Sequence, residues 1–194
     1  MSGLFDADDE ATPLAPEERE GLIPTHVAYR HELNELEQQN ILEADAWALG
    51  RRRDVLDEGF LKRLHQRMFG RVWRWAGEYR ATERNIGVHP LQIPIDMRQV
   101  LGDAKYWVAH NSYQPDELAV RLHHRLVWVH PFPNGNGRWS RLVADILIIG
   151  LGGERFTWGR TNLQPVGQIR KGYIDALRAA DDHDITALLA FARS

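Results

Sequence analysis

The residues best suited to chemistry lie in one short stretch, His130 to Arg141, with the sequence HPFPNGNGRWSR. An imidazole titrates near neutral pH, so His130 can accept a proton from an incoming hydroxyl group. A Gly-Asn-Gly turn that begins a helix offers free backbone N–H groups to a phosphate, and arginine side chains bind phosphate oxygens through paired hydrogen bonds. The stretch therefore predicts a polyphosphate site with a base beside it.

Two well-known phosphate motifs are excluded for this stretch. It lacks the Gly-x-x-x-x-Gly-Lys-Ser/Thr pattern of a Walker loop, and no strand precedes it as in a dinucleotide-binding fingerprint. The alternative interpretation is structural, with His130 only capping a helix and Gly-Asn-Gly only forming a tight turn. The combination of a histidine, a glycine-rich loop and two arginines favours the nucleotide site.

Helices are predicted on both sides of this loop. The preceding segment begins with Pro115 and two acids, which suit a helix N-terminus, and its apolar residues recur at helical spacing up to His130. The following segment, Gly137 to Ile149, is apolar on nearly every side, as a buried central helix is. The same signals predict five more helices, at Thr25–Arg53, Asp54–Gly70, Ile95–His110, Pro165–Ala180 and Asp184–Ala192.

Two segments are predicted to be irregular or extended. Residues 1–24 contain three prolines and no apolar periodicity, which indicates an irregular N-terminal arm before a single domain at residues 25–194. Short β-prone pieces between Thr82 and Pro94, interrupted by Gly87 and Pro90, predict a small β-hairpin that would form a flap.

Composition excludes several classes of function. With 24 Lys and Arg against 27 Asp and Glu, the net charge is −3, so nucleic acid is not an expected partner. The absence of cysteine excludes disulfides and thiolate chemistry and fits a cytoplasmic protein. The longest apolar run, Leu142 to Ile149, is far shorter than the roughly 20 residues that cross a bilayer, so no membrane association is expected.

The whole pattern resembles the Fic domain, whose signature is His-Pro-Phe-x-Asp/Glu-Gly-Asn-Gly-Arg-x-x-Arg. The resemblance covers roughly residues 25–194, because it extends upstream to Trp75-Ala76-Gly77-x-x-Arg80 and His123 and downstream to Arg170-x-x-Tyr173-x-x-Ala176-Leu177. Within the family the sequence is most similar to the bacterial group called mobile mystery protein B. The resemblance implies an all-α, Fic-type helical domain with a small β-hairpin flap. It also implies transfer of AMP from ATP to a Ser, Thr or Tyr hydroxyl of a target protein, or of the chain itself.

Roles for individual residues follow from the same resemblance. His130 would be the general base, and Phe132 would anchor the loop in the core. The flap would align the backbone of the target protein by strand addition. The nucleotide would be bound by Asn134, Gly135, Asn136, Gly137, Arg138 and Arg141, with the two arginines on the β- and γ-phosphates, and the flap would include Thr82, Ile86, Gly87 and Ile93.

One residue departs from the family pattern. Asn134 stands where the family has an acid that helps to hold Mg²⁺, and an amide oxygen supplies a metal ligand without a charge. We therefore expect a weakened Mg²⁺ site at Asn134 that depends on the phosphates of ATP. The change keeps two alternatives open: transfer of a different group, such as the γ-phosphate, or a nucleotide-binding regulatory module with reduced catalysis.

Regulation and partners are also implied by the resemblance. Many Fic domains are inhibited by a glutamate that pairs with the second arginine of the signature, and Glu37 is the nearest candidate here. A glutamate on the solvated face of a helix is the alternative interpretation of Glu37. The expected partners are a target protein that presents a hydroxyl group and, as in toxin-like members of the family, an antitoxin or other inhibitory protein. A homo-oligomer is a further alternative.

Overall fold

The protein is mostly helical, which confirms the all-α prediction. The structure, a computed structural model, describes residues 15–161 and 166–194. Its elements are α1 Pro16–Arg19, α2 Arg30–Leu49, α3 Glu58–Phe69, the 3₁₀ helix η1 Pro90–Gln92, α4 Ile93–His110, α5 Pro115–Val129, α6 Asn136–Gly150, α7 Val166–Asp181 and α8 Thr186–Arg193. In the described ranges, no helix is long and apolar enough to span a membrane.

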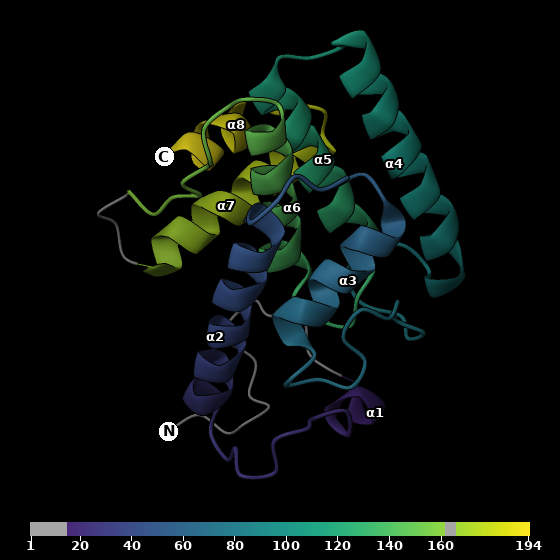
Figure 1. Ribbon diagram of the computed structural model, residues 1–194, viewed down its shortest axis with the longest axis vertical. Helices are drawn as coiled ribbons and strands as arrows, with labels where there is room; N and C mark the ends of the chain where they lie inside the picture. The colour runs from purple at the N-terminus through teal and green to yellow at the C-terminus, as the bar shows by residue number, and fades with distance from the viewer. Residues whose placement is uncertain (1–14, 162–165) are drawn as a thin grey trace.

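Helix α6 lies at the centre of the fold, as its all-round apolar sequence predicts. It packs along α5 and also contacts α2 and α3, while α4 covers another face of α5 and the pair α7–α8 packs on α5 (Figure 1). Its apolar residues Val143, Ala144 and Ile148 have no exposed surface. This arrangement places the end of α5 and the beginning of α6 together in the interior, with the loop 130–135 between them.

Local hydrogen bonds explain why two helices are shorter than predicted. Helix α2 begins at Arg30 and not at Thr25, because the Glu32 carboxylate accepts the N–H groups of Ala28 and Tyr29 and fixes the start there. Helix α3 begins after Asp57, whose carboxylate accepts the N–H of Phe60 at 2.6 Å. The predicted start of α7 at Pro165 lies outside the described residues.

The predicted β-hairpin flap does not form. Residues 80–89 contain no strand, and the isolated bridge between Leu22 and Trp73 lies outside them. The carbonyls of Thr82 and Val88, which could join a ladder, accept hydrogen bonds from the Arg80 side chain. Ile93, predicted to lie in the flap, instead begins α4 and is completely buried. The flap, defined here as residues 81–89, is therefore an irregular loop.

The described part of the N-terminal arm is ordered against the domain and contains α1, whereas the sequence predicted an irregular segment. The N–H of Ile23 donates to the carbonyl of Val72 at 2.8 Å, and the N–H of Arg74 donates to that of Gly21 at 2.9 Å. The indole N–H of Trp75 donates to the carbonyl of Glu18 at 3.0 Å. These contacts hold the arm beside the segment that leads into the flap.

Two histidines are completely buried in the core. His65 accepts the N–H of Gly77 at Nδ1 and donates from Nε2 to the carbonyl of Asn134, both at 3.0 Å. His123 Nε2 lies 3.0 Å from the hydroxyl of Tyr173. Burial lowers the pKa of each imidazole to about 3, so both are neutral at pH 7.

These histidines predict loss of stability in mild acid. An unfolded histidine binds a proton below its ordinary pKa of about 6.5, whereas His65 and His123 in the folded protein do not until about pH 3. Each therefore lowers the free energy of unfolding by up to roughly 1.4 kcal/mol per pH unit as the pH falls below about 6. Chemical denaturation between pH 7 and pH 4.5 measures the slope.

A matched pair of variants tests the origin of this slope. His65→Gln retains a donor and an acceptor but cannot titrate. The slope of the free energy of unfolding against pH should therefore decrease by the contribution of about one proton. His26→Gln changes an exposed histidine and should leave the slope as it is in the parent protein. Equal slopes in His65→Gln and the parent would contradict the assignment.

Candidate active site

The loop between α5 and α6 has a defined shape because two of its residues take left-handed backbone angles. His130 ends α5 with φ of 51°, and Gly135 precedes α6 with φ of 80°. A Cβ atom on Gly135 would lie 2.6 Å from the Phe69 ring, so only glycine fits. The Asn136 side chain closes the loop, accepting the N–H of Phe132 at 2.9 Å and donating to its carbonyl at 2.8 Å.

The core holds this loop from beneath. The Phe132 ring is fully buried and stacks on His65 at 3.7 Å between ring centroids, so Phe132 is anchored in the core. Both polar atoms of the Asn136 side chain bind the backbone of Phe132, and these two hydrogen bonds stabilise the loop. The N–H of Trp139 donates to the carbonyl of Gly135, the residue before α6, at 2.9 Å and so makes the first hydrogen bond of the helix. The preceding N–H groups are the ones that an anion at a helix N-terminus receives.

The two arginines of the motif lie in different electrostatic environments. Arg138 forms an ion pair with Glu37 at 2.6 Å, and the same buried carboxylate accepts the indole N–H of Trp73 at 2.6 Å. The resemblance implied pairing of Glu37 with the second arginine, but the structure places Glu37 against the first. Arg141 donates from Nε to the carbonyl of Gly137 at 3.2 Å, and no carboxylate of the described residues lies within ion-pairing distance of it.

His130 is buried beside two cationic side chains. It is 7 % exposed, and neither ring nitrogen has a hydrogen-bond partner among the described residues. Burial, together with the positive charges of Arg80 and Arg84, lowers the pKa of His130 to about 4. The imidazole is therefore neutral at pH 7, which is the form that accepts a proton.

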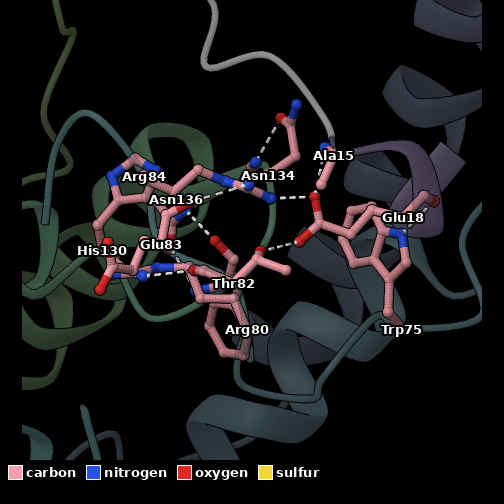
Figure 2. A network of polar contacts seen from close by, with 12 residues as sticks. Ala15, Glu18, Trp75, Arg80, Thr82, Glu83, Arg84, His130, Asn134 and Asn136 are labelled. Carbon is pink, nitrogen blue, oxygen red and sulfur yellow. Dashed lines mark hydrogen bonds and ion pairs between the residues drawn. The ribbon is translucent and has the colours of Figure 1, made fainter. Parts of the chain in front are cut away.

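Arg80 organises the backbone around His130. Its guanidinium donates to the carbonyl of His130 at 2.7 Å, to that of Thr82 at 2.9 Å and to that of Val88 at 2.5 Å, as Figure 2 shows in part. Its own N–H donates to the carbonyl of Pro131 at 2.9 Å. The side chain thus stabilises the left-handed turn at His130 and joins the two ends of the flap at one point.

Asn134 is a poor metal ligand in its present conformation. Its Oδ1 accepts the N–H of the next residue, Gly135, at 2.5 Å, and its carbonyl accepts Nε2–H of His65. No group of three or more His, Asp or Glu residues in the described ranges could hold a metal ion. The residues present fit a divalent cation only as a single neutral oxygen, with the other ligands coming from phosphates and water.

Sequence analysis missed three residues that shape the site. Arg80 was noted only as part of a motif, His65 was one of nine histidines, and Glu18 lay in the predicted irregular arm. Glu18 binds Arg84 and Thr82 of the flap across 66 and 64 residues of sequence. Contacts between residues so far apart in the chain produce no periodic pattern in the sequence. The WAG motif before Arg80 was the one indication available for any of them.

The charge of Arg80 predicts a shift in the pKa of His130. Arg80→Gln removes the positive charge next to the imidazole, so the pKa of His130 should rise by about one unit. Arg80→Lys retains the charge but cannot bind three carbonyl groups, so the pKa should change much less. NMR titration of the His130 ring protons in both variants measures the difference. An equal shift in both would show that the charge is not the cause.

Comparison with known proteins finds similarity to one family over the part of the chain that holds the site. The sequence model of the Fic/DOC family matches residues 55–148, which include the flap, α5, the loop and most of α6. The chain is 32 % identical over 135 residues to the protein adenylyltransferase Fic of Drosophila grimshawi and 32 % identical over 138 residues to that of Culex quinquefasciatus. These matches cover 66 % and 68 % of the chain but only 26 % of each relative, so the chain spans about a quarter of the length of these proteins.

Solved structures share the fold at lower sequence identity. The BepC protein of Bartonella tribocorum, solved with bound AMPPNP, is 16 % identical with a TM-score of 0.67, and the match covers 92 % of this chain and 97 % of that one. Fic-1 from C. elegans is 21 % identical with a TM-score of 0.68, over 90 % of this chain and 51 % of that one. A Fic domain from Bartonella quintana, solved with bound ADP, has a TM-score of 0.64 at 15 % identity, covering 87 % and 86 %.

Proposed function

Because residues 55–148 form a Fic/DOC family domain, we propose that this chain is a protein adenylyltransferase. It transfers AMP from ATP to a Ser, Thr or Tyr hydroxyl of a target protein. The observation that carries the proposal is a neutral, buried imidazole next to a helix N-terminus and Arg141, which has no acidic partner among the described residues. A proton acceptor and an anion site at this spacing suit attack of a hydroxyl group on a bound phosphate.

The reaction follows from these positions. A ring nitrogen of His130 accepts the proton of the target hydroxyl as its oxygen bonds to the α-phosphorus of ATP. The bond from that phosphorus to the bridging oxygen breaks, and pyrophosphate leaves. The backbone of Gly135, Asn136 and Gly137 binds the phosphates at the start of α6, and Arg141 neutralises charge on the leaving group. The target is aligned by the flap residues Thr82, Ile86 and Gly87, of which Ile86 is 47 % exposed.

The proposed reaction uses Mg²⁺ as a cofactor, and most of the ligands of this ion would come from ATP and not from the protein. Mg²⁺ bound to ATP neutralises the phosphate oxygens and helps pyrophosphate to leave. Asn134 would supply one amide oxygen after releasing the N–H of Gly135, and the phosphates would supply the remaining charge. Asn134 also favours a second candidate function, transfer of the γ-phosphate, because the acid that would help to hold Mg²⁺ in other family members is missing here.

ATP labelled at the α- or the γ-phosphate separates these candidates. Incubation with a lysate should transfer the α-label to protein, and His130→Ala should reduce transfer at least about 10²-fold, since a general base contributes about that much or more. His124→Ala, on the same helix but paired with Asp181, should retain activity. Transfer of the γ-label alone would support phosphotransfer. Equal labelling by the parent and His130→Ala would favour a nucleotide-binding regulatory module.

We further propose that Glu37 inhibits the enzyme in cis. Its carboxylate lies 2.6 Å from the Arg138 guanidinium, where a phosphate oxygen of ATP would otherwise bind. The carboxylate is the buried partner of the pair: the side chain of Glu37 is 7 % exposed and is also bound by Trp73, whereas the side chain of Arg138 is 35 % exposed. ATP can use Arg138 only after this pair separates. An inhibitory partner protein would act by stabilising this pair.

Removal of the carboxylate tests this inhibition. Glu37→Gly should increase nucleotide affinity and AMP transfer about tenfold or more, since a hydrogen-bonded charge pair contributes on the order of 1.5–3 kcal/mol. The control is Glu35→Gly, which places the same helix-destabilising residue at an exposed position of α2. ATP binding by calorimetry and transfer of the α-label measure both effects. An increase in Glu35→Gly equal to that in Glu37→Gly would contradict a specific role for Glu37.

A further inference from the structure

A second buried acid reaches the site from the N-terminal arm. The Glu18 side chain is 10 % exposed, and its carboxylate forms an ion pair with Arg84 of the flap, whose side chain is 6 % exposed. The same carboxylate accepts the hydroxyl of Thr82 at 2.8 Å and the N–H of Ala15 at 2.8 Å. Figure 2 shows this network extending from α1 across the flap towards His130. Glu18 therefore links the N-terminal arm to the flap, and both segments lie outside α5 and α6.

The arm is positioned firmly enough to act on the flap. The Trp75 indole N–H donates to the Glu18 carbonyl, and a Cβ atom on Gly21 would lie 2.6 Å from the Trp75 ring, so the chain passes close over this tryptophan. The backbone bonds of Gly21 and Ile23 to Arg74 and Val72 continue the attachment. The Glu18 carboxylate is thus held at a fixed place beside Arg84.

The flap covers the base that the proposed reaction needs. A Cβ atom on Gly87 would lie 2.5 Å from Cβ of His130, so the flap backbone rests directly on that residue. Both ring nitrogens of His130 are buried and have no partner among the described residues. A hydroxyl group must come within about 2.6–3.2 Å of one of these nitrogens to lose its proton. The part of the flap over His130 must therefore move before a target protein can react.

Different residues hold the ends and the middle of the flap. The ends are fixed by Arg80, which binds the carbonyls of Thr82 and Val88. Between these points, Glu83 and residues 85–87 are exposed, whereas Arg84 turns its side chain inward to Glu18. The pair Glu83–His89 at 3.2 Å lies within the flap itself. Among the described residues, it is the Arg84–Glu18 pair that ties the middle of the flap to another element.

We propose that Glu18 is an autoinhibitory latch that keeps the flap closed over His130. The proposal rests on the proposed function. A buried ion pair that loses one partner leaves an uncompensated charge, which is unfavourable in the interior. Without the Glu18 carboxylate, Arg84 therefore turns towards water and moves the middle of the flap away from His130. Glu37 and Glu18 act on different reactants: Glu37 blocks an arginine that binds ATP, and Glu18 blocks access of the target hydroxyl group.

Flap opening can be measured without any catalytic assay. Glu18→Gln keeps the shape and the hydrogen bond to Thr82 but removes the charge. Hydrogen exchange of residues 82–88 should become about tenfold faster or more, as expected when a local contact that closes a segment is lost. Modification of His130 by diethyl pyrocarbonate, followed by peptide mass spectrometry, should increase similarly because its ring nitrogens become accessible. Glu17→Gln, a change at an exposed position of the same helix, is the control. Hydrogen exchange of the flap and modification of His130 should both stay as they are in the parent protein.

Activity then tests whether opening releases the enzyme. In the Glu37→Gly background, where ATP can bind, adding Glu18→Gln should raise AMP transfer to protein several-fold over Glu37→Gly alone. Arg84→Gln, which removes the other partner, should have the same effect and provides a second route if Glu18→Gln folds poorly. Unchanged exchange and unchanged His130 modification in both variants would overturn the latch. Faster exchange accompanied by reduced transfer would also overturn it, because the arm would then position the flap for the reaction.

The result also separates the latch from the proposed function. If the flap opens in Glu18→Gln and no variant transfers any label from ATP, the latch stands and the adenylyltransferase proposal fails. If AMP transfer depends on His130 but neither exchange nor transfer responds to Glu18 or Arg84, the adenylyltransferase proposal stands and the latch fails.

Discussion

The site depends on one constrained turn, in which His130 leaves α5 in a left-handed conformation and the chain enters α6 six residues later. A non-glycine residue is strained in this conformation, so the surrounding structure has to hold it there. Arg80 does so by binding the carbonyl of His130, and Asn136 does so by binding both backbone groups of Phe132. The base and the helix N-terminus consequently lie at a fixed separation before any ligand binds.

The arginines around the loop are the second feature on which the site depends, and two of them are neutralised by acids. Four arginines surround the loop, and the two acids that pair with them come from segments outside it: Glu37 from α2 binds Arg138, and Glu18 from the arm binds Arg84. Arg80 is satisfied by carbonyl groups, and Arg141 has no acidic partner within the described residues. The positive charges of Arg138 and Arg84 are therefore neutralised by acids that lie outside the loop.

The sequence predicted those parts of the fold that depend on local signals. Helix α5 was predicted with its observed bounds because Pro115 and the following acids define its start and the apolar stripe runs unbroken to Val129. The β-hairpin prediction for the flap was wrong because β-prone residues and glycines indicate only an extended loop. The long-range side chain of Arg80 takes the carbonyls that strand pairing could have used.

By itself, the sequence from His130 to Arg141 determined that a base, a helix N-terminus and an arginine pair are neighbours, because adjacency along the chain guarantees it. Only the tertiary structure decided which arginine is paired, how deeply the base is buried and what covers it. Those properties arise from Glu18, Glu37, His65 and Arg80, which lie between 50 and 101 residues from their key partners in the chain. Contacts over such separations are set by helix packing, and no local pattern of residues records them.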